Sequence, residues 1–254
     1  MRVELKKYDG IERDMYVIYP AGERLCCYEN TIITILREGN SEILLKELEK
    51  DKEFEKLVDE QRLLLLFPNP IDGVWNWEMK PDQADDVHDI VKLIDAFNYQ
   101  PSFVDVGIYH TMHNARYFMG EGTGASMAHT LAAVNPVNIA GMLTIGGDIA
   151  QVAMEQSKNS AVPAILWNAS EMASCFMKVL NCVDAGENGY YYNTVNDCQM
   201  VCEEKRDGGR LDAYSIRYAW NHLFSKVCRS NSCVYGEVGP RTVKDDYKFI
   251  VHED

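Results

Sequence analysis

The residues of this chain that could do chemistry gather in Ala115–Val134, where Gly120-Glu121-Gly122-Thr123-Gly124 separates a short apolar run from a helical pattern of small residues. This pattern predicts a buried strand, a very tight turn and a helix packed closely against the strand, because only small residues allow such an approach. The glycines could also form a phosphate cradle. However, the Lys-Ser/Thr pair of a P-loop and the acidic ribose ligand of a dinucleotide site are both missing. We therefore interpret the stretch as a strand–turn–helix junction.

Histidine and cysteine spacings offer two candidate metal sites. His110 and His113 have the spacing of two ligands on one helix face, but only Asp105 lies nearby to complete a ligand set. The cysteines at 198 and 202, with those at 228 and 233, lack the tight C-x2-C knuckles that are typical of zinc sites. We expect surface histidines and free thiols here, no metal site and no cofactor.

Charge and composition exclude several classes of function. The chain has 254 residues, a formal net charge of −14 and a pI of about 4.9. We therefore expect no binding to nucleic acid or to an anionic membrane, since both require cationic patches. The N-terminus, MRVELKKYDG, has no apolar signal core, and no apolar run approaches the ~20 residues of a membrane span. We expect a cytoplasmic protein that folds as one domain over residues 1–254, with 229–254 as an extension or the start of a further segment.

The order of the elements predicts an α/β fold. Thr31–Leu36 and Leu63–Phe67 are continuously apolar, as strands buried on both faces are, and Ser41–Leu57 between them has helical spacing with Ser41 as its N-cap. Strand, helix and strand in this order predict a mostly parallel sheet with helices on both faces. The further elements that we expect are an edge strand in RDMYVIYP, a helix over Ala84–Phe97, strands at Ile139–Ile145 and Pro163–Trp167, a weaker strand in QMVCEEKRDGG, a helix in LDAYSIRYAWNHLFSKV and a strand-like YKFIVHED.

Several of these pieces together resemble the α/β-hydrolase superfamily, in its polyhydroxybutyrate-depolymerase and feruloyl-esterase-like branch. The pieces are LLLLFPNPIDGVWNWE, ADDVHDIVKLIDAF and YFMGEGTGASMAHTLAAVNP, with looser matches in AVPAILWNASE and YSIRYAWNHLFSKV. The likeness covers most of residues 15–228. It implies an α/β-hydrolase fold and carboxylic-ester hydrolysis, although activity does not follow from fold.

The resemblance implies a nucleophile on the turn and an oxyanion-hole loop after the first buried strand. When the motif G-x-S-x-G is aligned on its outer glycines, Gly122 takes the position of the nucleophilic serine, and glycine has no side chain with which to attack. The oxyanion loop falls on Arg37-Glu38-Gly39-Asn40, where Glu38 brings a carboxylate that would repel a forming oxyanion. The backbone N–H of Thr123 is the second donor, and it does not depend on side-chain identity.

The resemblance also implies an acid and a histidine. The acid falls on Glu171, which follows the strand ending at Trp167 and could equally be a surface residue. The histidine belongs in EEKRDGGRLDA, where Arg210 or Leu211 stands instead. Nucleophile, histidine and oxyanion loop therefore depart from the family pattern together. Because these parts act as a unit, we expect the hydrolytic machinery to be absent.

A pocket at the carboxyl ends of the strands remains expected, since ligands of open α/β sheets bind there. Our first hypothesis is a degenerate esterase-like protein that binds a small ester-like ligand or a protein partner. The alternative is an active carboxylic-ester hydrolase that uses Ser126 or Thr123 with His129 or His252. The expected pocket and oxyanion residues are Arg37, Glu38, Gly39, Gly120, Glu121, Gly122 and Thr123, with Trp75 and Trp77 as walls or as ordinary loop packing.

Overall fold

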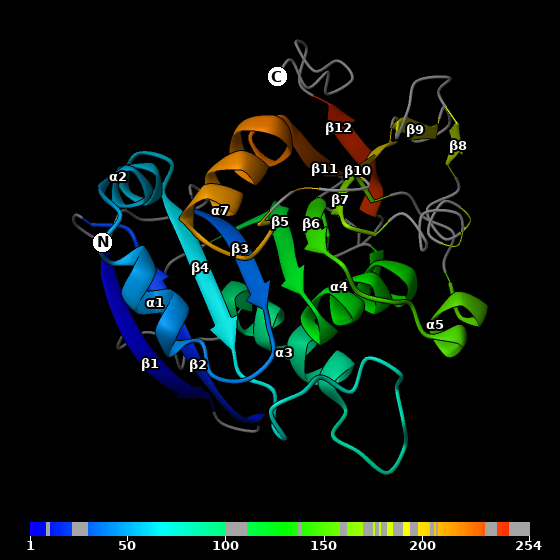
Figure 1. The fold of residues 1–254 in the computed structure, drawn as a ribbon, viewed down its shortest axis with the longest axis horizontal. Coiled ribbons are helices and arrows are strands. Elements are labelled where there is room, and N and C mark those ends of the chain that lie inside the picture. The colour runs from blue at the N-terminus through cyan, green and yellow to red at the C-terminus, as the bar shows by residue number, and fades with distance from the viewer. Residues whose placement is uncertain are drawn as a thin grey trace.

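A long, mostly parallel sheet forms the centre of the computed structural model (Figure 1). The structure describes residues 1–8, 11–21, 30–99, 111–136, 139–157, 162–169, 175, 178, 182–184, 190–193, 198–203, 206, 208–231 and 238–243. Ten strands of these residues make one sheet in the order β1-β2-β4-β3-β5-β6-β7-β10-β9-β8. They are β1 (Arg2–Tyr8), β2 (Ile11–Tyr19), β3 (Asn30–Leu36), β4 (Leu63–Pro68), β5 (Thr111–Glu121), β6 (Gly141–Ile145), β7 (Ala164–Trp167), β8 (Val183–Asp184), β9 (Tyr190–Asn193) and β10 (Cys198–Glu203).

Strand direction divides this sheet into a parallel centre and antiparallel edges. The strands β4, β3, β5, β6, β7 and β10 pair in parallel, whereas β1 and β2 at one edge and β9 and β8 at the other pair antiparallel. A second, two-stranded sheet consists of β11 (Val227–Asn231) and β12 (Val238–Val243). The parallel centre places the carboxyl ends of β3, β5, β6 and β7 along one edge, and the candidate site lies there.

Helices cover both faces of the sheet, as the sequence predicts. Helices α1 (Glu42–Leu48), α2 (Lys52–Glu60) and α7 (Ala213–Ala219) pack on one face, together with a π-helical turn, η3 (Trp220–Phe224). Helices α3 (Asp86–Tyr99), α4 (Thr123–Val134) and α5 (Gln151–Glu155) pack on the other. Alternate residues of the central strands point into the two resulting cores. Ile33, Leu65 and Leu143 belong to the first core, and Ile32, Leu64 and Met142 belong to the second.

The predicted βαβ unit is confirmed, with a correction to its helix. The strands β3 and β4 are parallel neighbours, but the single helix expected over Ser41–Leu57 is two helices. Asp51 takes an extended conformation (φ −87°, ψ 106°), and its side chain accepts a hydrogen bond from the Phe54 N–H, which starts α2. Ser41 is at the N-cap position of α1 without a side-chain capping bond, and the Asn40 side chain instead accepts a hydrogen bond from the Glu42 N–H.

Other expected elements are present with small shifts. The strands at 139–145, 163–167 and 198–203 and the helix over 84–97 correspond to β6, β7, β10 and α3. The strand in RDMYVIYP is β2, which lies inside the sheet, because the charged strand β1 forms the edge. The late helix is α7 continued by η3, and YKFIVHED lies outside the described residues. None of the helices in the described ranges combines the length and apolar composition that a bilayer crossing requires.

Candidate functional site

The predicted strand–turn–helix junction is present, with Gly122 at its apex. Strand β5 ends at Glu121, Gly122 has φ 58° and ψ −127°, and α4 begins at Thr123. A positive φ with this ψ is unfavourable for residues with a side chain, so the turn itself favours glycine. The Gly122 N–H donates to the Ile145 carbonyl at 3.3 Å, which joins the turn to the end of β6. Gly122 is exposed, so the apex of the turn faces solvent.

Small residues around the apex let α4 touch the sheet. A Cβ at Gly124 would lie 2.1 Å from the Leu36 carbonyl oxygen, and a Cβ at Gly120 would lie 2.5 Å from the Gly124 carbonyl oxygen. Neither distance can hold a carbon atom, so the backbones of β3, β5 and α4 meet with no side chain between them. The N-terminus of α4 therefore sits directly against the loop that follows β3.

That loop brings the Glu38 carboxylate to the apex. Glu38 Oε1 accepts a hydrogen bond of 2.9 Å from the Thr123 N–H. The same oxygen would lie 2.9 Å from a Cβ built at Gly122. The carboxylate therefore occupies space that a side chain at residue 122 would need, and it binds the N–H that the resemblance implies as an oxyanion donor. The resemblance predicts that Glu38 repels an oxyanion. In the structure the Glu38 carboxylate is hydrogen-bonded to the expected donor, the Thr123 N–H.

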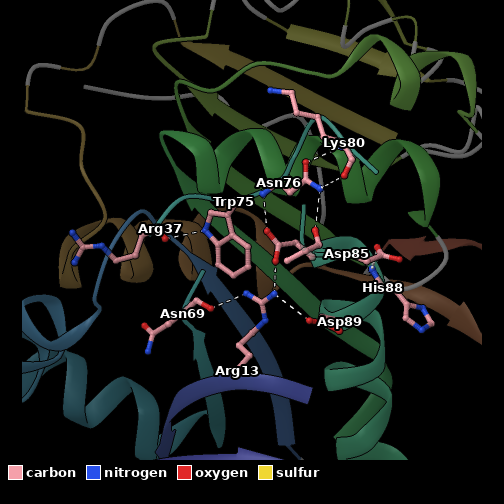
Figure 2. A network of polar contacts seen from close by, with 11 residues as sticks. Arg13, Arg37, Asn69, Trp75, Asn76, Lys80, Asp85, His88 and Asp89 are labelled. Carbon is pink, nitrogen blue, oxygen red and sulfur yellow. Dashed lines mark hydrogen bonds and ion pairs between the residues drawn. The ribbon is translucent and has the colours of Figure 1, made fainter. Parts of the chain in front are cut away.

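The loop that carries Glu38 is fixed on both sides of that residue. The Trp75 indole N–H donates to the Arg37 carbonyl at 2.9 Å, and the Gly39 N–H donates to the Gly73 carbonyl at 2.8 Å. Gly39 has φ 65°, which lets the chain turn there. The side chain of Arg37 points away from Trp75 (Figure 2). The loop after β4 thus holds the loop after β3 in place.

A buried ion-pair network fixes Trp75 in turn (Figure 2). The Arg13 guanidinium lies 5.0 Å from the centroid of the Trp75 ring and contacts Asp86 and, at 3.2 Å, Asp89. Asp86 also accepts a hydrogen bond of 2.6 Å from the Asn76 N–H. Arg13 and Asp86 are 4% and 2% exposed. This network links β2, the loop after β4 and the start of α3.

The two predicted tryptophan walls have different surroundings. Trp75 is 2% exposed and belongs to the core on the α3 and α4 face. Trp77 is partly buried against the same core, and its carbonyl accepts a hydrogen bond of 3.0 Å from the Thr130 hydroxyl. Both tryptophans therefore pack the loop onto the core.

The resemblance places the catalytic acid in the loop after β7 and the histidine in the loop before α7. In the structure, contacts between Asn168 and Arg206 join these two loops. Glu171 lies outside the described residues. Asn168, just after β7, has φ 55° and accepts a hydrogen bond of 3.0 Å from the Arg206 N–H. The Arg206 guanidinium lies 4.6 Å from the Trp167 ring centroid and 4.2 Å from that of Tyr218. A hydrogen bond from a backbone N–H to the Asn168 side chain, together with cation–π contacts, therefore connects the two loops that carry the acid and the histidine in the hydrolases.

Arg210 and Leu211 occupy the predicted histidine position without catalytic geometry. Arg210 is exposed and forms ion pairs with Glu47 at 3.3 Å and with Asp212 at 3.4 Å. The Leu211 N–H lies 3.5 Å from its acceptor, the Glu121 carboxylate at the end of β5. The loop thus approaches the apex, but a guanidinium has only hydrogen-bond donors and no acceptor, so Arg210 cannot act as a general base.

The hydroxyls and the histidine of α4 take part in structural contacts. Ser126 Oγ accepts a hydrogen bond of 2.7 Å from the Asp148 N–H, and Thr123 Oγ1 is a buried atom with no hydrogen-bond partner in the described part of the chain. His129 is 1% exposed, with Nε2 at 2.8 Å from Thr144 Oγ1 and Nδ1 at 3.1 Å from the Asp148 carbonyl oxygen. Burial lowers the pKa of His129 to about 4, against an ordinary value of 6.5, and the contact with Asp148 opposes this shift.

The predicted metal candidates are not assembled in the described ranges. His113 lies in strand β5, so the helical spacing expected for it with His110 does not apply, and His110 is outside the described residues. Cys198 and Cys202 lie in strand β10 and Cys228 in β11. No group of three or more metal-ligating side chains occurs among the residues that the structure describes.

Comparison with known proteins identifies the fold. No family model matches the sequence, and no curated protein matches it significantly. An acetyl xylan esterase from Aspergillus awamori is similar in structure, with a TM-score of 0.56 and 12% identity over 80% of this chain and 92% of that one. FphF, a fluorophosphonate-binding serine hydrolase from Staphylococcus aureus, has a TM-score of 0.54 and 10% identity over 88% of this chain and 96% of that one. S-formylglutathione hydrolase (FrmB) from Staphylococcus aureus has a TM-score of 0.51, with 10% identity and the same coverages of 88% and 96%.

The chain therefore has the α/β-hydrolase fold, in an arrangement similar to that of esterases. Identities this low establish the fold and not the reaction. Its junction at Gly122 has the same order of strand, tight turn and helix as the nucleophile elbow of that fold.

Proposed function

We propose that this protein is an esterase-like member of the α/β-hydrolase fold that does not hydrolyse esters and acts as a binding or non-catalytic domain. The observation that carries the proposal is Gly122, which occupies the apex of the elbow in the required backbone conformation and offers no nucleophile. Catalysis by serine, histidine and acid is strongly non-additive, so a site that lacks the serine gains little from the other parts.

The surroundings of the elbow support this proposal. Arg210 and Leu211 stand at the expected histidine position, and neither side chain has an acceptor that could take a proton from a nucleophile. Ser126 and His129 hold the segment Gly146–Ala150 against α4 through Asp148. Thr123 Oγ1 is buried, so a substrate carbonyl cannot reach it without rearrangement. These contacts disfavour the alternative, an active ester hydrolase with a displaced nucleophile and base.

A non-catalytic role leaves binding as the function. We propose a small ester-like ligand or a protein partner, bound in the cytoplasm at the carboxyl edge of the sheet, where open α/β sheets bind their ligands. The formal net charge of −14 supports a partner other than nucleic acid or an anionic membrane surface.

Covalent labelling with an alkyl fluorophosphonate tests the proposal. This reagent phosphonylates an activated serine or threonine hydroxyl, and the intact mass of the protein reports the adduct. We expect an unchanged mass after prolonged incubation. One equivalent of adduct on the wild-type chain that disappears in Ser126→Ala or Thr123→Val would contradict the proposal, because it would reveal a displaced nucleophile.

A further inference from the structure

The Glu38 carboxylate contacts both halves of the elbow. One oxygen, Oε1, accepts a hydrogen bond of 2.9 Å from the Thr123 N–H and lies 2.9 Å from the place of a Cβ at Gly122. We propose that Glu38 is an autoinhibitory plug: its carboxylate holds the oxyanion position of the elbow, and an anionic oxygen of a ligand can reach the Thr123 N–H only when Glu38 moves away.

The N-terminus of α4 explains why a carboxylate is stable there. The first N–H groups of a helix have no partner within the helix, and the positive end of the helix dipole favours a negative group. Gly122, the N-cap residue, has no side chain to accept such a bond. Glu38 supplies the acceptor from another element, and it does so where an ester hydrolase would stabilise a tetrahedral intermediate.

The backbone on either side of Glu38 is held by hydrogen bonds. The carbonyl of Arg37 and the N–H of Gly39, on either side of Glu38, are bound by Trp75 and Gly73. Trp75 is itself held by the buried Arg13 network (Figure 2). Opening the plug therefore requires rotation of the Glu38 side chain about its own bonds, not movement of the loop.

Gly122 and Glu38 depend on each other. A serine at position 122 would bring its Cβ within 2.9 Å of Oε1 and 3.2 Å of Cδ of Glu38, which forces the carboxylate off the Thr123 N–H. The hydrogen bond between the Glu38 carboxylate and the Thr123 N–H therefore requires glycine at position 122. The inference uses the same elbow as the proposed function, but it concerns which group holds the Thr123 N–H and does not depend on the absence of hydrolysis.

Amide hydrogen exchange at Thr123 tests the plug in the unmodified protein. In wild type we expect the Thr123 amide to be protected, and in Glu38→Ala we expect its exchange to be about tenfold faster, as for the loss of one hydrogen bond to a charged acceptor. Glu38→Gln keeps an acceptor without the charge, so its Thr123 amide should exchange at an intermediate rate. The amide proton resonance should move upfield in the same order.

A matched control is Glu42→Ala, which removes a nearby carboxylate that bonds to the Tyr16 hydroxyl. This variant should leave Thr123 exchange unchanged. Equal Thr123 exchange in wild type and Glu38→Ala would overturn the inference, and it would do so whether or not the protein hydrolyses esters. Conversely, ester hydrolysis by the wild-type chain would contradict the proposed function. The inference about Glu38 would still stand if the Thr123 amide were protected.

Discussion

At the scale of single residues, the elbow depends on Gly124 as much as on Gly122. Gly124→Ala places a Cβ about 2 Å from the Leu36 carbonyl oxygen, so β3 and α4 must separate. We expect a loss of about 3 kcal/mol in the free energy of unfolding, at the upper end for an overpacked core. Urea unfolding measures this loss.

Gly146→Ala is the control for this substitution. Gly146 has φ 66°, but nothing lies within 4 Å of its Cβ position, so the cost is that of the backbone conformation alone, roughly 1 kcal/mol. Similar losses in both variants would show that the close approach of β3 and α4 is not what requires Gly124.

His129 gives the protein a dependence on pH. Its pKa is lowered by burial to about 4 in the folded state, against 6.5 in the unfolded chain, so the unfolded chain binds the proton more readily between these values. Its contribution to stability is therefore complete above about pH 6.5 and is lost as the pH falls to about 4, a difference of about 3 kcal/mol.

Substitution at two histidines isolates this effect. In His129→Gln the unfolding free energy should fall less steeply between pH 6.5 and pH 4 than in wild type, since that titration is gone. His88 is exposed on α3, and His88→Gln should keep the wild-type slope. Urea unfolding at several pH values gives both slopes, and equal slopes in all three proteins would contradict the assignment.

At the scale of elements, Asp51 organises the break between α1 and α2. Its carboxylate caps α2 through the Phe54 N–H and pairs with Arg217 of α7 at 2.7 Å. Asp51→Ala should cost about 1–2 kcal/mol, mostly through the lost cap. Arg217→Ala removes only the partly exposed ion pair and should cost less than about 1 kcal/mol. Thermal unfolding ranks the two variants, and the reverse order would show that the contact with α7 matters more than the cap.

The elements themselves could largely be predicted from the sequence. Continuous apolar runs such as Leu63–Phe67 are typical of strands covered on both faces, and β4 is indeed central. The break at Asp51 was not predicted, because the apolar residues on its two sides were interpreted as one helical pattern and a cap is a local hydrogen bond. Strand β1 was not predicted, since an edge strand with an exposed Leu5 lacks a clean alternating pattern.

At the scale of the whole molecule, the buried pair of Arg13 and Asp86 connects strand β2 to the loop that supports the site. Asp86→Ala leaves a buried guanidinium with fewer partners and frees the Asn76 N–H, so we expect a loss of about 3 kcal/mol. Glu47→Ala breaks the exposed pair with Arg210 and should cost less than about 1 kcal/mol. Chemical unfolding compares the two variants, and equal costs would show that the buried network is not structural.

The candidate site was only partly predictable. The glycine spacing identified Gly122 at the apex, because the motif needs its small residues in fixed register. The charge of Glu38 in the oxyanion loop was visible in the sequence, but its hydrogen bond to Thr123 was not, since it depends on how the loops after β3 and β4 hold each other. The contacts of Arg206 with Trp167 and Tyr218 join residues far apart in the chain, and no local pattern marks them.

The measurement that tests the central claim most directly is hydrolysis of p-nitrophenyl acetate and butyrate by the wild-type protein beside Gly122→Ser and Gly122→Ser/Glu38→Ala. We predict the buffer rate for all three, because no residue of the described site can activate a hydroxyl at position 122. Turnover by the wild-type chain well above buffer, reduced by Thr123→Val or Ser126→Ala, would contradict the account and show an ester hydrolase with a rebuilt site.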